Sequence, residues 1–155
     1  MLISTKGRYS LRVMIDLAAH QTNGYIPLKE IAARQEISEK YLEIIVKLLV
    51  KGSFLTGLRG KGGGYKLTKS PDQYTVGSIL RLTEDSLSPV SCLEADAPAC
   101  PRMAACHTLP LWKGLDKVIS DYLDQVTVAD LVRQARETDC AIHKAPSQNS
   151  SGKNP

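Results

Sequence analysis

The chain has 155 residues, the size of one domain or of a domain with an appendage, and a formal net charge of +4. Residues 1–81 contain 13 Lys/Arg and 6 Asp/Glu, whereas residues 82–155 contain 7 and 10. This asymmetry indicates a first half that binds a polyanion, joined to a part with another task. No run approaches the roughly 20 apolar residues of a membrane span, and the N-terminus lacks the apolar core of a signal peptide. We therefore expect a cytoplasmic protein that does not bind membranes.

The first half of the chain predicts three short helices. Apolar residues recur at helical spacing over Ser10–His20, and Asn23-Gly24 forms a turn after them. Pro27 stands where a second helix can begin. Ser38 is a good N-cap for a third helix over 38–51, and Gly52 is its natural stop. The second and third helices together predict a helix-turn-helix.

Two short strands are expected next, at 54–58 and 65–68, joined by a glycine-rich tip with the sequence RGKGGG. Glycines allow positive φ angles and a close approach of the backbone to a duplex. Arg59 and Lys61 supply charge on either side of Gly60, and an arginine on a thin loop can enter a narrow minor groove. A nucleotide-binding loop is disfavoured, because GxxxxGK[ST] is absent and the loop leads into a strand. The basic hairpin is typical of the wing of a winged helix.

The predicted third helix would enter the major groove with its N-terminal residues closest to the bases. Ser38 and Tyr41 can donate to phosphates or bases, and Lys40 neutralises phosphate. Glu43 is repelled by phosphate unless it accepts from a cytosine amino group. We therefore interpret Glu43 as a residue for specificity rather than affinity. With one more helix over 75–83, the winged helix-turn-helix domain spans residues 1–83.

Residues 84–107 are irregular and contain three cysteines in the pattern C-x7-C-x5-C, followed at once by a histidine: Cys92, Cys100, Cys106 and His107. Thiolates are soft ligands suited to zinc or iron–sulfur sites. A position near a helix N-terminus also favours the thiolate of Cys106. Spacing alone leaves structural zinc and an iron–sulfur centre equally open, with unconnected thiols as the alternative to both. Cys140 lies beyond the last predicted helix and is not expected to be a ligand.

A long helix over 108–126 follows, with large apolar residues at spacings of three and four: Trp112, Leu115, Ile119, Tyr122 and Val126. Such a seam predicts a dimerisation helix. Thr127 can cap a last helix that ends near Glu137, within a C-terminal part over 108–140. The polar tail 141–155 is expected to be disordered. The predicted fold class is mainly α with a small β-hairpin, a winged helix-turn-helix domain plus a long dimerisation helix.

Three runs of sequence resemble the bacterial winged-helix transcription regulators of the iron–sulfur cluster assembly regulator (IscR) type: ISTKGRYSLRVMIDLA, IPLKEIAARQEISEKYLEIIVKLL and GLRGKGGGYKLTK. The resemblance covers residues 1–137, and the RGxGGGY wing joined to YLE is its most specific part. It implies a homodimer on a partly palindromic DNA operator, with contacts at Ser38, Lys40, Tyr41, Glu43, Arg59 and Gly60. In such regulators the glutamate at the Glu43 position helps cluster-free and cluster-bound forms choose different operators.

The same resemblance implies a [2Fe–2S] cluster on Cys92, Cys100 and Cys106, because three cysteines in this loop mark the cluster-sensing members. The sequence departs from the familiar C-x5-C-x5-C pattern by two extra residues in the first interval. Aligning on the tryptophan places Leu109 where the family has a histidine ligand. His107 is the nearest candidate for the fourth ligand.

The leading function is therefore a repressor that senses cluster supply and controls iron–sulfur assembly genes, with assembly scaffold proteins as candidate cluster donors. Alternatives keep the fold but sense nitric oxide, redox stress or cysteine supply, or carry structural zinc. A further alternative is a protein that binds an enzyme through the long helix and the tail. An enzyme is not expected, because no Ser/His/Asp, paired-carboxylate or HExxH arrangement occurs.

Overall fold

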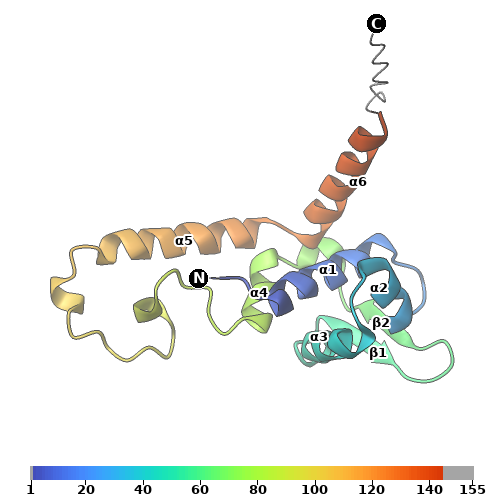
Figure 1. Ribbon diagram of the computed structural model, residues 1–155, viewed down its shortest axis with the longest axis horizontal. Coiled ribbons are helices and arrows are strands. Elements are labelled where there is room, and N and C mark those ends of the chain that lie inside the picture. The colour runs from blue at the N-terminus through green and yellow to red at the C-terminus, as the bar shows by residue number, and fades with distance from the viewer. Residues whose placement is uncertain (1, 145–155) are drawn as a thin grey trace, which may run out of the picture.

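The computed structural model describes residues 2–144, with side chains as far as Thr138. The helices α1 (Thr5–Ala19), α2 (Leu28–Gln35), α3 (Glu39–Lys51) and α4 (Val76–Thr83) gather around a hairpin of β1 (Leu55–Leu58) and β2 (Gly64–Leu67). From this group α5 (Leu109–Gln125) projects to one side, and α6 (Val128–Lys144) leaves at a steep angle to it (Figure 1). Short 3-10 turns are η1 (Pro71–Gln73), η2 (Ser91–Leu93) and η3 (Met103–Ala105). Within the described residues, no helix has the length and apolar character needed to cross a membrane.

Helix α1 begins at Thr5, five residues before the start predicted at Ser10. Ser4 caps it, because its Oγ accepts a hydrogen bond from the Gly7 amide at 3.2 Å. Glu84 in turn holds Ser4, since its Oε1 accepts from the Ser4 amide at 3.2 Å and from the hydroxyl at 2.7 Å. A Cβ on Gly7 would lie 2.0 Å from the same oxygen. The helix start therefore depends on a residue 80 positions along the chain.

The core lies between α1, α3 and α4 and is closed by the hairpin. Its fully buried side chains include Val13, Met14, Leu17, Ile31, Leu42, Ile45, Val46, Leu49 and Ile79. On α3 the buried residues recur at spacings of three and four, which leaves the opposite face of the helix free. This packing fixes α3 with one face in the core and one face outward.

Asp16 is a charged side chain inside this core, with none of its side-chain surface exposed. It accepts from Arg34 Nε at 3.0 Å, from Arg34 Nη2 at 2.8 Å and from Gln35 Nε2 at 2.9 Å. These bonds attach the C-terminal end of α2 to α1. Glu36 then takes a left-handed conformation (φ 53°) and leads into α3. The Asp16–Arg34 ion pair therefore fixes the C-terminal end of α2 against α1, at the point where the chain turns into α3.

The hairpin pairs Leu55 with Leu67 and Leu58 with Gly64 in antiparallel register. Both strands lie within one residue of the predicted positions. A third extended segment joins them, because Ile26 and Tyr65 exchange two backbone hydrogen bonds of 2.9 and 2.8 Å. A Cβ on Gly64 would lie 2.2 Å from the Ile26 carbonyl oxygen, so only glycine allows this pairing. The hairpin is therefore anchored to the segment that enters α2.

The start of α6 matches the prediction, since Thr127 Oγ1 accepts from the Asp130 amide at 3.1 Å and Asp130 accepts from the Thr127 amide at 3.0 Å. The predicted end near Glu137 is wrong, because α6 continues to Lys144. Of the tail expected from 141, residues 141–144 belong to α6, and 145–155 lie outside the described residues.

Helix α5 is joined to the N-terminal group at its C-terminal end. Arg81 of α4 donates two hydrogen bonds of 2.7 Å to the two carboxylate oxygens of Asp124. The backbone adds two more bonds, from the Val76 amide to Val126 and from the Val128 amide to Tyr74, at 2.8 and 2.9 Å. The α5–α6 corner is therefore held against α4.

Candidate nucleic-acid interface and cysteine loop

The first turns of α3 carry four of the residues predicted to contact DNA. Ser38 caps the helix by accepting from the Tyr41 amide at 3.3 Å, which leaves its hydroxyl proton free to donate. Lys40 and Glu43 are exposed. Tyr41 is only half exposed, because its ring packs edge-on against Tyr9 with centroids 5.7 Å apart. The helix therefore presents Lys40 and Glu43 freely and Tyr41 in part.

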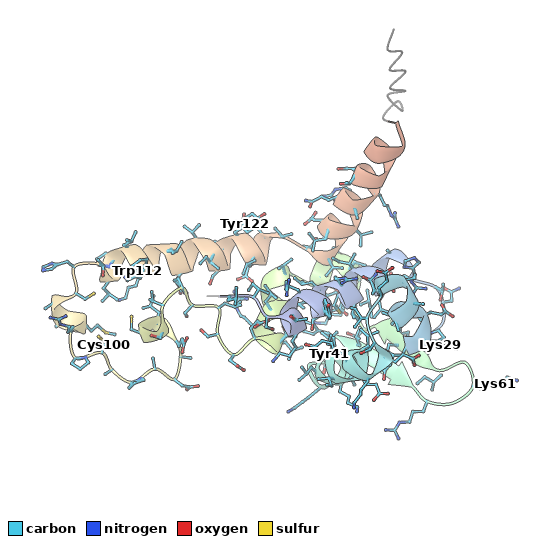
Figure 2. The ribbon with its side chains drawn as sticks, in the orientation of Figure 1. Lys29, Tyr41, Lys61, Cys100, Trp112 and Tyr122 are labelled. Carbon is cyan, nitrogen blue, oxygen red and sulfur yellow. The ribbon has the colours of Figure 1, made fainter. Side chains whose placement is uncertain are left out.

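The other three predicted contact residues occupy the turn of the hairpin, where Arg59, Gly60 and Lys61 are all exposed. Figure 2 shows Lys61 at the far end of the hairpin from the helical core. Gly60 has φ 88°, and a Cβ there would meet no atom within 4 Å. Glycine is thus required by the backbone angle and not by packing. The tip leaves its backbone open for approach by a ligand.

A groove of about 380 Å³ lies between α3 and the hairpin. Lys47 and Lys51 line it from the helix and Arg59 from the hairpin. Two exposed apolar side chains, Val50 and Leu58, also line it. The groove therefore combines cations from two separate elements with an apolar lining.

The exposed face of α3 extends further than the predicted contacts. Lys40, Ile44, Lys47 and Lys51 follow one another at spacings of four, three and four, and all are exposed. Of these, only Lys40 is among the DNA contacts predicted from the sequence. The signal that could have found the others is the spacing itself, read on the face opposite the buried stripe. Lys47 Nζ also lies 3.8 Å from Glu43 Oε2. Because this ion pair is exposed and weak, both side chains remain able to move.

The cysteine loop, residues 84–107, places its three thiols on separate short segments. Cys92 lies in η2, Cys106 directly follows η3, and Cys100 lies between them (Figure 2). All three are free and half-buried. Cys140 lies in α6, at a position whose side chain is outside the described part.

The neighbours of Cys106 lower the pKa of its thiol. The side chain of Thr108, with Oγ1 3.4 Å from Cys106 Sγ, lowers the pKa of the thiol, and the Thr108 backbone acts in the same direction. Trp112 Nε1 donates to the same hydroxyl at 3.2 Å. Because the indole N–H can only donate, the hydroxyl proton remains available for the sulfur. A series of hydrogen bonds from Trp112 through Thr108 thus favours the thiolate of Cys106.

The four residues predicted to bind metal are not gathered into a site. Among the residues that the structure describes, no three His, Cys, Asp or Glu side chains lie together as metal ligands would. Cys106 and His107 do line one open pocket of about 490 Å³, together with Arg102 and Thr108. The donors suit an iron–sulfur or zinc site in their chemistry. Their assembly around a metal stays a prediction.

The outer face of α5 carries large apolar side chains at spacings of four, three and four. Leu111, Leu115, Val118 and Tyr122 are 62, 40, 64 and 65% exposed. Of the predicted seam, only Leu115 and Tyr122 lie on this face. Trp112, Ile119 and Val126 are only partly exposed, and α5 packs against α4 at its C-terminal end. The exposed apolar stripe therefore shares only two residues with the predicted seam and lies on a different face of α5.

The chain is similar in sequence and in fold to known transcriptional regulators. The model of a family described as Rrf2, iron-dependent transcriptional regulator, matches residues 3–134. The chain is 35% identical to the HTH-type transcriptional regulator IscR of Erwinia tasmaniensis, over 94% of this chain and 92% of the relative. It is similar to the structure of CymR, the global cysteine regulator of B. subtilis, with 39% identity, a TM-score of 0.70, and coverage of 86% of this chain and 98% of the other. The structure of T. potens IscR matches at 34% identity and a TM-score of 0.70, over 98% and 94%. The predicted resemblance and fold class are confirmed.

Proposed function

Because the chain belongs to the Rrf2 family of transcriptional regulators, we propose that it is a homodimeric repressor that binds a DNA operator and senses iron–sulfur cluster status. Its targets are genes for iron–sulfur cluster assembly. The chain divides into the DNA-binding domain 1–83, the cysteine loop 84–107 and the dimerisation region 108–140. The observation that carries the proposal is the basic groove between α3 and the hairpin.

The groove suits one strand of duplex DNA. A helix in the major groove and a hairpin in the adjacent minor groove lie on either side of a single sugar–phosphate strand. That strand must then pass between α3 and the hairpin, where Lys47, Lys51 and Arg59 can neutralise its phosphates. The contacts proposed for the helix and the tip are Ser38, Lys40, Tyr41, Glu43, Arg59, Gly60 and Lys61.

The dimer is proposed to form through α5. Four large apolar side chains on one exposed stripe are unfavourable in water, and a second α5 would bury them. A two-fold dimer also presents two α3 helices to the two halves of a partly palindromic operator.

The cysteine loop is proposed as the sensor. Cys92, Cys100 and Cys106 would hold a [2Fe–2S] cluster, with His107 as the fourth ligand and assembly scaffold proteins as donors. When bound, such a cluster supplies a labile, redox-sensitive group. The chain's own part is to offer thiolates, and the hydroxyl of Thr108 stabilises the one on Cys106.

Each end of the cysteine loop is connected to the DNA-binding domain by hydrogen bonds. Glu84, where the loop begins, holds the cap of α1 through two hydrogen bonds to Ser4. The helix that follows the loop holds α4 through Asp124 and Arg81. A change in the loop can therefore bias the position of α1 and of α5, and with them the spacing of the two α3 helices.

A second candidate signal is cysteine supply or redox stress. It is favoured by the 39% identity to CymR, described as a global cysteine regulator. In this case the same three thiols act as free thiols, and DNA binding keeps the same groove. Structural zinc is a third candidate, and the test below separates it from the other two. Nitric oxide as the signal and an enzyme as the partner are the remaining alternatives.

The test is an absorption spectrum of full-length protein purified without oxygen, with iron, sulfide and zinc measured on the same sample. We expect iron and sulfide in equal amounts with visible absorption, lost in each Cys→Ala variant at 92, 100 and 106. His107→Ala should leave a labile cluster with a shifted spectrum, since an imidazole ligand is more easily replaced than a thiolate. Cys140→Ala is the control that should match wild type. Stoichiometric zinc without iron or sulfide would contradict the cluster, and protein without any metal would favour the thiol alternative.

A further inference from the structure

One large apolar side chain stands exposed in the middle of the basic face of α3. Four other apolar residues of this helix are buried in the core, whereas Ile44 is 50% exposed. Lys40 lies one turn before it and Lys47 one turn after it, both exposed. An apolar side chain between two lysines does not serve the core. The lysines on both sides of Ile44 attract a polyanion, so a polyanion is the partner expected to cover this side chain.

DNA offers one apolar group to a helix in its major groove. The base edges there are hydrogen-bond donors and acceptors, and the exception is the C5 methyl group of thymine. We propose that Ile44 reads a thymine methyl group in the operator and is a specificity-determining residue of this protein. The inference rests on the DNA-binding function proposed above and adds a base identity to it.

The direction of the side chain supports this assignment. Helical side chains lean toward the N-terminus of their helix, so Ile44 covers the surface beside Lys40 rather than the far end of α3. The N-terminal turns are the ones that approach the base edges. Lys40 and Lys47 can bind phosphates on either side and hold Ile44 at one register on the duplex.

Glu43 stands next to Ile44 and has the complementary chemistry. Its exposed carboxylate accepts hydrogen bonds, which suits the amino group of cytosine, whereas Ile44 offers only an apolar surface. The two neighbours can therefore select different pyrimidines at nearby positions. Removing one preference should leave the other in place.

The experiment uses the full-length protein and an operator duplex selected by it from a random library. Each thymine is replaced in turn by deoxyuridine, which lacks only the methyl group. For wild type we expect one position in each half-site where the replacement weakens binding about fourfold, the value of one buried methyl group. In Ile44→Ala this penalty should vanish, and in Ile44→Val part of it should remain. Leu2→Ala, which truncates an apolar side chain exposed elsewhere, should keep the wild-type pattern.

The assignment is overturned if Ile44→Ala shows the full deoxyuridine penalty, or if no thymine is sensitive while wild type binds the duplex tightly. Either result leaves the proposed DNA-binding function intact. Failure of wild type to select any duplex would instead contradict the proposed function, and this inference with it. A wild-type pattern that disappears in Leu2→Ala as well would also contradict the assignment to Ile44.

Discussion

At the scale of single residues, the Cys106 thiol depends on one hydroxyl group. The Thr108 side chain lowers the pKa of Cys106, so the thiolate persists to lower pH than an ordinary cysteine. Thr108→Val removes the donor and should raise that pKa. The pH midpoint for alkylation of Cys106 by iodoacetamide should therefore move upward, in metal-free protein with the other three cysteines changed to serine. Thr108→Ser should restore the low midpoint, and an unchanged midpoint in Thr108→Val would count against the hydrogen bond.

The negative charge of Glu43 opposes DNA binding at the proposed contact face of α3. Its carboxylate is exposed on the face of α3 proposed to meet DNA, 3.8 Å from Lys47. Glu43→Ala removes a repulsive element, so it should broaden the set of bound sequences rather than only weaken binding. Selection from a random duplex library by both proteins would measure this. The same motif returned by Glu43→Ala at lower affinity would contradict the specificity role.

At the scale of elements, α3 and the hairpin should share the contacts to one DNA strand. Lys47→Ala and Lys51→Ala should each reduce the slope of log affinity against log salt by about one, because each removes a phosphate contact. Neither should change the preferred sequence. Arg59→Ala should lower the slope and also relax sequence preference if the arginine enters a groove. Lys113→Ala on α5 is the matched control, and slopes equal to wild type in all three variants would refute the placement of the strand.

Helix α5 should decide the oligomeric state. Leu115→Glu and Val118→Glu each place a charge in the middle of the exposed apolar stripe, where a second α5 would bury it. We expect monomers by light scattering and at least a tenfold loss of operator affinity, on the order of 1.4 kcal/mol or more. Lys113→Glu changes charge elsewhere on the same helix. It should remain dimeric, and dimers in the two stripe variants would exclude this face as the interface.

At the scale of the whole molecule, acid should loosen the C-terminal part. The Thr127 amide and hydroxyl, and then Arg133, hold the pKa of Asp130 at about 2. Hydrogen bonds from Arg81 likewise lower the pKa of Asp124. A carboxyl with a lowered folded-state pKa stabilises the fold above its unfolded pKa near 4, and loses that contribution as pH falls toward 2. The urea midpoint of Asp130→Asn should therefore lie below wild type at pH 6 and approach it near pH 2. A gap that stays constant with pH would contradict this.

The elements themselves could be predicted where their signals are local. Ser38 caps α3 through an amide three residues away, and Thr127 and Asp130 cap α6 in the same way. The glycine-rich tip also acts within its own turn. Such cues operate over a few residues, so the sequence alone places α2, α3, the hairpin and the start of α6.

Other features were decided by partners far along the chain. The early start of α1 needs Glu84, which holds the capping residue Ser4. Gly52 is a second example, because its role also depends on a distant residue. Gly52 was predicted as a helix stop by its conformation, yet its φ is −77° and the left-handed residue is Ser53. A Cβ on Gly52 would lie 2.4 Å from Leu82 of α4. A larger residue there would displace the Leu82 side chain, so the small size of Gly52 serves packing between helices, which no local pattern records.

The sequence by itself therefore determined the kinds of element and the basic hairpin. It also supplied the residues that are proposed to bind DNA and the three thiols that are proposed to sense a signal. Only the tertiary structure decided which face of α5 is left uncovered and that α3 carries an exposed Ile44 among lysines. It also decided that the thiol of Cys106 is paired with the hydroxyl of Thr108. The physical reason is that periodicity identifies an apolar stripe without saying what covers it. Burial and hydrogen-bond partners are set by contacts between segments that are distant in the chain.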